Sequence, residues 1–187
     1  MPDIDALIRS YPANEALLCE VLVRDYYSYL YRIALSFLGD PLEADDIAQE
    51  SLLRALQNLR KYEAGTNFKN WLAAIAVNLS RDALRRHAAR QRMHQLLLAT
   101  FHLASPALDT PEEIVEHEER DAMLWKIVNE LNDIHRTPLI LRYVHGLPVS
   151  SIANILGIKE GTVHSRLHYA IRKIEKYYQA GGILPLN

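Results

Sequence analysis

The chain has 187 residues, 49% of them apolar, which is enough to bury a core and excludes a disordered polymer. Its single cysteine, Cys19, excludes an intramolecular disulfide framework and fits a reducing compartment. No apolar run approaches the ~20 residues of a membrane span, and the N-terminus lacks a signal-peptide pattern, so we expect a cytoplasmic protein that is not itself in the membrane.

The formal net charge of −2 conceals blocks of opposite sign along the chain. Residues 40–50 are acidic and contain no base, whereas residues 71–94 contain five arginines and one acid. Residues 109–121 are acidic again, and residues 136–176 are basic. This alternation indicates separate surfaces for separate partners, and a basic face needs only a local field to attract phosphates.

Scarce glycine and the lack of strand-type alternation predict an all-α fold. Apolar residues at helical spacing predict a first helix over residues 16–38, and the Gly-Asp-Pro that follows ends it and begins the next. The second helix is predicted over residues 42–59. A turn-rich loop at residues 63–67 leads into a third helix over residues 68–92, with its apolar side chains inward and its arginines outward.

Further helices are predicted over residues 113–131 and 137–145. Thr137 would cap the latter, with Pro138 in its first turn, and an earlier start at Asn132 is the alternative. We therefore predict two small helical domains, residues 1–94 and 113–187, joined by a linker.

The linker is predicted over residues 95–112, and its second half is rich in Ser, Pro, Asp and Thr. Its first half, Gln95 to Leu103, is too apolar for a flexible tether. This segment either prolongs the third helix and packs on the N-terminal domain, or it clamps the two domains together in the free protein. The sequence leaves both possibilities open.

Residues 150–174 predict a helix-turn-helix, with a Gly-containing turn between two short helices. Val163, Leu167, Ala170 and Ile174 form an apolar stripe at helical spacing. Short polar side chains at the start of the second helix, with bases behind them, suit entry into the major groove. The candidate DNA-binding residues, which the resemblance described below assigns to a −35 promoter element, are Lys159, Glu160, Thr162, His164, Ser165, Arg166, His168, Arg172 and Lys173.

Two alternatives exist for this helix. Its polar side could be an ordinary solvated face, since helix-turn-helix look-alikes are common. His164 and His168 have the i, i+4 spacing of metal ligands, but no cysteine or third histidine follows nearby, so we expect no metal. Among the bases, we expect Lys173 to contact phosphate, whereas Arg166 could contact phosphate or a base edge.

Three stretches together resemble a known family, the extracytoplasmic-function class of bacterial sigma-70 factors. "LILRYVHGLPVSSIANILGIKEGTVHSRLHYAIRKI" resembles its C-terminal region 4. "DPLEADDIAQESLLRAL" resembles the acidic helix of region 2, and "FKNWLAAIAVNLSRDALRR" resembles the segment that binds and melts the −10 element. The resemblance covers residues 17–90 and 113–178. Asn132 departs from a common Pro, and His168-Tyr169 lowers the usual number of bases on the reading helix.

The resemblance implies an assignment for the acidic helix, which would dock on the β′ clamp helices of RNA polymerase core, with the β flap as a further contact of the sigma factor. Carboxylates suit a basic coiled coil through charge-assisted hydrogen bonds, and a leucine adds an apolar anchor. A solvated helix face is the alternative. The implied polymerase-binding residues are Asp45, Asp46, Gln49, Glu50 and Leu53.

The third helix and the loop before it would meet the −10 element, where unstacked bases need aromatic and amide partners. Trp71 is in phase with Leu72 and Ile75, so we expect it in the core rather than stacked on a base. The implied −10 residues are Asn67, Phe68, Asn78, Arg81, Asp82, Arg85 and Arg86.

The resemblance implies a transcription initiation factor that binds polymerase core and promoter DNA and is controlled by an anti-sigma factor. Such a protein is not an enzyme, takes no small-molecule substrate and needs no cofactor. Two other classes share some features. A dimeric repressor or activator would use the same helix-turn-helix without the acidic helix, and a decoy that binds polymerase or an anti-sigma factor would not need the basic faces.

Overall fold

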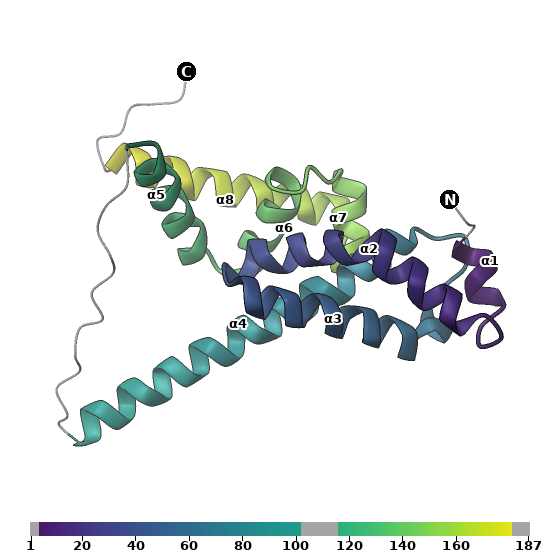
Figure 1. Ribbon diagram of the computed structural model, residues 1–187. Helices are drawn as coiled ribbons and strands as arrows, with labels where there is room; N and C mark the ends of the chain where they lie inside the picture. Colours follow the sequence, from purple (N-terminus) through teal and green to yellow (C-terminus); the bar gives the residue numbers. More distant parts are fainter. Residues whose placement is uncertain (1–3, 102–115, 181–187) are drawn as a thin grey trace.

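A computed structural model describes residues 4–101 and 116–180 of the chain, and it places the side chains of residues 4–93 and 123–177. Every element in these ranges is a helix, as predicted. The N-terminal part contains α1 (Ile4–Arg9), α2 (Glu15–Leu38), α3 (Pro41–Gln57), the 3₁₀ turn η1 (Leu59–Lys61) and α4 (Phe68–Phe101). The C-terminal part contains α5 (Glu116–Glu130), α6 (Asp133–Tyr143), α7 (Val149–Leu156) and α8 (Glu160–Ala180) (Figure 1).

The junction between α2 and α3 forms as the sequence predicts. Gly39 ends α2 with a φ of +71°, a left-handed conformation that glycine adopts without strain, and its N–H donates to the Leu35 carbonyl at 2.9 Å. Asp40 then caps α3, because its Oδ1 accepts from the backbone N–H groups of Leu42 at 2.8 Å and Glu43 at 3.0 Å. The two helices therefore lie side by side in opposite directions, with α4 packed against both (Figure 1).

Helix α4 begins at Phe68, where Asn67 Oδ1 accepts from the backbone N–H of Asn70 at 3.0 Å. It ends at Phe101, past the end predicted near Arg92, so that Gln95 to Phe101 prolong the helix, which is one of the two possibilities that the sequence left open. Residues 93–101 include no proline or glycine that would stop a helix, so the helix continues to Phe101. The backbone of Gln95 to Phe101 is thus helical, while the side-chain contacts of this segment, and Leu103, lie outside the described residues.

Helix α6 begins earlier than Thr137, which corrects our first choice of start. Asn132 is its N-cap and accepts from the Ile134 N–H at 3.3 Å. Thr137 is 2% exposed and points its hydroxyl to Asp133 Oδ1 at 3.0 Å, so it is not a cap. Pro138 lies inside the helix. The earlier alternative at Asn132 is the one that forms.

The predicted helix-turn-helix is α7 and α8. Gly157 makes the turn with a φ of +63°, and the Ile158 N–H donates to the Ala153 carbonyl at 3.0 Å to close α7. The predicted apolar stripe of α8 faces inward, since Val163 is 0% and Leu167 7% exposed. This stripe packs α8 on α6 and α7.

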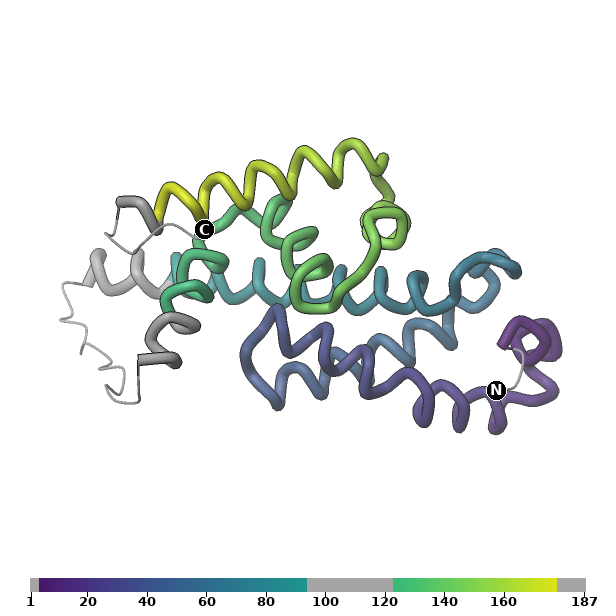
Figure 2. The backbone as a smooth tube through the Cα atoms, turned by 90° about the horizontal axis from the view of Figure 1, so that it is seen from above, coloured from purple at the N-terminus to yellow at the C-terminus, as the bar shows by residue number. Residues whose placement is uncertain are grey.

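The two halves of the chain are in contact. Buried side chains of α2, α3 and α4 belong to the same apolar cluster as those of α6, α7 and α8. The contact is made largely by α7 packing on α4, and Figure 2 shows α6 and α7 between α8 and the N-terminal helices. Burial of each large apolar side chain in such a cluster contributes about 1.5–3 kcal/mol, so this contact contributes to the arrangement in which the halves meet.

Candidate nucleic-acid and polymerase interface

Helix α3 presents an acidic face with an apolar residue at its end. Asp46 and Gln49 are exposed, and the side chain of Glu50 is 44% exposed and accepts from Arg54 Nε at 2.7 Å. Leu53 is 54% exposed at the end of this face, where its side chain is available to a partner.

Asp45 lies at the edge of this face rather than at its centre. It is half-buried and accepts hydrogen bonds from the Tyr27 hydroxyl of α2 and from Gln49 Nε2, the latter at 2.9 Å. The bond to Tyr27 fixes α3 against α2. Asp45 therefore positions Gln49 on the acidic face and has less freedom than Asp46 to meet a partner.

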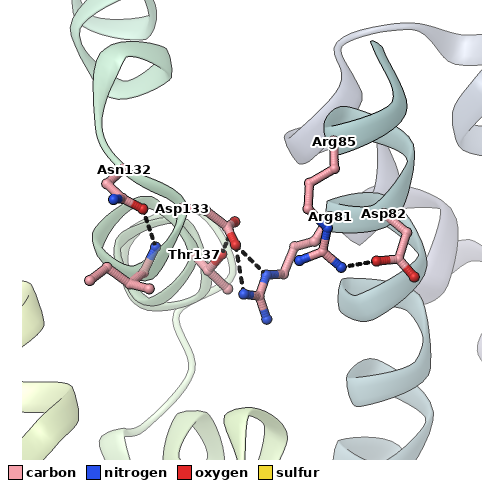
Figure 3. A network of polar contacts seen from close by, with 7 residues as sticks. Arg81, Asp82, Arg85, Asn132, Asp133 and Thr137 are labelled. Carbon is pink, nitrogen blue, oxygen red and sulfur yellow. Dashed lines mark hydrogen bonds and ion pairs between the residues drawn. The ribbon is translucent and has the colours of Figure 1, made fainter. Parts of the chain in front are cut away.

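The predicted −10 residues of α4 lie on its solvent side, except for Phe68 and Arg81. Asn78 and Arg86 are exposed, and Arg85 pairs with Asp82 on the adjacent turn. Arg81 instead turns toward the C-terminal half of the chain, where its guanidinium meets Asp133 (Figure 3). The structure therefore places Asn78, Asp82, Arg85 and Arg86 on the solvent side of α4, whereas the Arg81 side chain is directed to Asp133.

The loop before α4 is supported by a cluster of aromatic rings. Phe68 is 4% exposed and packs edge-on to Tyr26 and Tyr62, with ring centroids 5.4 Å and 5.0 Å away. Trp71 is half-buried beside it at 5.5 Å, which confirms its predicted place against the core. Because Phe68 is buried here, its ring supports the loop, whereas Asn67 is exposed at the loop's end.

Helix α8 divides the predicted −35 residues between two sides. The outward side carries most of them, and these are exposed: Glu160, His164, Ser165, His168 and Arg172, together with Lys159 just before the helix. Thr162, Arg166 and Lys173 are half-buried. Arg166 and Lys173 lie close enough to His135 of α6 to lower its pKa, after burial as the main cause.

His135 stacks on Tyr169 with ring centroids 4.1 Å apart, so α6 contributes to this edge of the reading helix. Its lowered pKa keeps the imidazole neutral between two cations. Arg166 and Lys173 therefore form a basic edge next to the outward side, where a DNA backbone would pass if α8 entered a groove.

Among the side chains that the structure places, two polar contacts join the halves of the chain. Arg81 Nε and Nη2 each lie 2.6 Å from Asp133 Oδ2, and Thr137 Oγ1 donates to the other carboxylate oxygen (Figure 3). Ser36 Oγ of α2 lies 2.9 Å from Nε2 of His145, just beyond the end of α6. Burial, and then the charge of Arg32, lowers the pKa of His145, so its imidazole is neutral in this contact.

Sequence reasoning missed several of these residues. Asp133 and Ser36 carry no local signal for their roles, because their partners are distant in sequence. Helix α1 was not predicted, and its Asp5 contacts the loop before α4. An acid followed by apolar residues at helical spacing was the one available sign of this helix.

Among the side chains that the structure places, no group of three His, Cys, Asp or Glu residues lies close enough to hold a metal ion. Within the same part of the chain, no helix is long and apolar enough to cross a membrane.

Comparisons with known proteins match both halves of the chain. The family model described as sigma-70 region 2 matches residues 22–90, and that of sigma-70 region 4 matches residues 127–176. The chain is 34% identical over 172 residues to the ECF RNA polymerase sigma factor SigL of Mycobacterium tuberculosis, covering 91% of this chain and 94% of SigL. It is 29% identical to the ECF RNA polymerase sigma factor SigW of Bacillus subtilis, covering 83% of this chain and 86% of SigW.

Solved structures share the fold. CnrH in complex with the cytosolic domain of CnrY is similar with a TM-score of 0.66 and 20% identity, covering 95% of this chain and 99% of CnrH. The sigma factor RpoE of Bartonella quintana, solved with the anti-sigma factor NepR, gives a TM-score of 0.57 at 23% identity, covering 86% of this chain and 94% of RpoE. These similarities extend over both halves of the chain.

Proposed function

This chain belongs to the extracytoplasmic-function class of the sigma-70 family, and from that premise we propose which of its surfaces meets each partner in promoter-specific transcription initiation. The α3 face with Asp46, Gln49 and Leu53 binds the clamp helices of the polymerase β′ subunit. The α4 face and the loop before it bind and help melt the −10 element. Helix α8 reads the −35 element.

The observation that carries this proposal is the separation of one acidic and two basic surfaces on three helices. The acidic face of α3 bears an exposed leucine, Leu53, at 54% exposure, which suits a protein partner. Arg85 and Arg86 lie on the exposed side of α4 about two turns from Asn78, and guanidinium and amide groups on one helix suit phosphates and unstacked bases. Short polar side chains on the outward side of α8 suit base edges.

The same proposal includes the setting in which the protein works. It acts in the cytoplasm as a polymerase subunit, without an enzymatic reaction, a cofactor or a small-molecule substrate. Residues 1–94 form the domain for polymerase and the −10 element, residues 113–187 form the domain for the −35 element, and residues 95–112 join them. An anti-sigma factor controls it, in keeping with the complexes of RpoE with NepR and of CnrH with CnrY.

Reconstituted transcription tests this function. The full-length protein is mixed with purified RNA polymerase core and genomic promoter fragments, and transcript starts are mapped. We expect starts at a defined subset of promoters that core alone does not use. Sequence-specific DNA binding without any start would favour a repressor or activator, and core binding without DNA binding would favour a decoy.

A further inference from the structure

Helix α1 lies outside residues 22–90, the part of the N-terminal half that the sigma-70 region 2 model matches. Its Asp5 nevertheless reaches the loop before α4. Asp5 Oδ2 accepts from the backbone N–H of Gly65 at 2.9 Å, and Asp5 Oδ1 accepts from the Tyr62 hydroxyl at 2.9 Å. One carboxylate thus binds both the start and the turn of this loop.

The loop needs such support because its turn is made by a residue with many available conformations. Gly65 has a φ of +86°, and glycine loses more conformational freedom than any other residue when it is held in one state. Tyr62 is 8% exposed, and its hydroxyl also lies 2.7 Å from the Thr66 carbonyl. Since a hydroxyl has one hydrogen, Asp5 and the Thr66 carbonyl share it.

We propose that Asp5 is a positioning residue for −10 recognition, because it holds residues 62–66 in the conformation that presents Asn67 and the start of α4 to unpaired bases. A loop ordered before binding does not lose that freedom on binding, which favours affinity and base discrimination together. This inference rests on the proposed function, which assigns the loop to the −10 strand.

The test uses holoenzyme assembled from core and the full-length chain. Fluorescence anisotropy measures binding of a single-stranded oligonucleotide that carries the −10 sequence upstream of a mapped start, and of a second oligonucleotide with those bases permuted. Asp5→Ala should weaken the matched oligonucleotide by about tenfold, the effect of losing one to two hydrogen bonds. It should also reduce the ratio between matched and permuted affinities, while binding to duplex −35 DNA stays unchanged.

Glu20→Gln is the matched control, because it removes one negative charge from the exposed surface of α2. Tyr62→Phe combined with Asp5→Ala should cost less than the sum of the single changes, since both remove the same hydrogen bond. Asp5→Asn, which keeps an acceptor oxygen, provides a milder variant if Asp5→Ala fails to fold.

Each outcome decides a different point. Wild-type holoenzyme that does not distinguish the two oligonucleotides overturns the assignment of the loop to the −10 strand, and this proposal with it. Wild-type discrimination that Asp5→Ala leaves intact overturns the positioning role alone. An equal loss on both oligonucleotides with a lower melting temperature identifies a merely structural residue and also overturns it.

The polar contact between the two halves carries a separate proposal. Asp133 contacts the guanidinium of Arg81 and also acts on that of Arg136. Burial is the main cause that lowers the pKa of Arg136, the charge of Asp133 raises it, and the charge of Arg81 lowers it. The side chains of Arg81 and Asp133 are only 25% and 28% exposed, so their attraction is less screened than that of a surface pair. Without Asp133, Arg81 and Arg136 would repel each other.

Promoter geometry conflicts with this closed arrangement. Elements centred about 35 and 10 base pairs upstream of a start are roughly 85 Å apart along B-DNA, at about 3.4 Å per base pair. A compact chain of this length has a radius of gyration of about 16 Å. A separation of about 85 Å is more than five such radii, so we expect the α4 and α8 faces to reach both elements only when α7 leaves α4.

We infer that the Arg81–Asp133 and Ser36–His145 contacts close the free protein and withhold Arg81 from DNA, so that closure and promoter binding exclude each other. Small-angle scattering of the free full-length protein tests this without DNA or polymerase, and hence independently of the proposed function. Asp133→Arg and Arg81→Glu should each increase the radius of gyration, and the double exchange should restore it.

Asp82→Asn is the matched control for scattering, because it breaks an ion pair on the same helix that stays within one domain. Opening should also raise the affinity of the free Asp133→Asn variant for promoter DNA, by about tenfold if one wild-type molecule in ten is open. Unchanged dimensions in both single variants, with normal circular dichroism, would overturn the closed state. Expansion that the double exchange does not reverse would overturn the role of this ion pair.

Discussion

Asp46 is exposed on α3, while its neighbour Ile47 is 8% exposed and holds the helix against the core. Asp46→Arg therefore changes the charge of the acidic face without disturbing packing. We expect loss of binding to polymerase core with an unchanged circular dichroism spectrum, because a cation replaces an acceptor opposite a basic coiled coil. Glu20→Arg on α2 is the control, and undiminished core affinity of Asp46→Arg would contradict the assignment.

His145 makes the closed state sensitive to pH. Its pKa is lowered from the ordinary 6.5 by burial and by Arg32 of α2, the same helix that provides Ser36. In an open state the imidazole regains its ordinary pKa and binds a proton more readily, so the closed state is favoured above pH 6.5 and weakens as pH falls toward the lowered pKa.

We therefore expect the radius of gyration of the free protein to increase as pH is lowered from about 7.5 to 5.5, a range that spans the ordinary histidine pKa. His145→Gln, which cannot take up a proton, should reduce this dependence. His135, whose pKa is also lowered by burial and by Arg166 and Lys173, remains in both proteins as a common background. An identical pH profile in wild type and His145→Gln would contradict the role of His145.

At the scale of elements, two glycines near the turn of the helix-turn-helix make a matched pair. Gly157 has a φ of +63°, whereas Gly161 lies in the first turn of α8, and a Cβ added there meets no atom within 4 Å. Gly157→Ala should destabilise the fold by about 1–2 kcal/mol, because the left-handed conformation is strained for alanine. Gly161→Ala should be neutral or stabilising by up to about 1 kcal/mol.

Urea unfolding followed by circular dichroism measures both changes. Equal stability of the two variants would contradict the turn geometry assigned to Gly157.

Helix boundaries with strong local signals could be predicted from the sequence. The start of α6 and the end of α4 could not, because their local signals were ambiguous or absent. Gly39 and Asp40 fixed the end of α2 and the cap of α3, because both act through neighbours within four residues. Asn132 and Thr137 were both possible caps of α6. Asn132 is the cap, because the Thr137 hydroxyl donates to Asp133 within the helix. The end of α4 was predicted too early, since residues 93–101 contain no proline or glycine and the helix runs through them to Phe101.

At the scale of the whole molecule, the sequence predicted which helices carry charge but not how the halves meet. The exposed acidic face of α3 and the outward side of α8 follow from helical spacing alone. The contact of Arg81 with Asp133 spans 52 positions and joins two surfaces that each look solvated in sequence. No periodic pattern distinguishes a helix face that meets DNA from one that meets the other domain.

The claim central to this account is that α4 and α8 of one chain occupy two promoter elements at once. Tethered DNA cleavage tests it most directly. The single native cysteine is changed by Cys19→Ser, a new cysteine is introduced by Asn78→Cys or by Ser165→Cys, and a cleavage reagent is attached to each in holoenzyme on a mapped promoter. We expect cleavage from α4 near the −10 element and from α8 near the −35 element, roughly 85 Å apart along the DNA. Cleavage from both positions at one element, or at neither, would contradict the account.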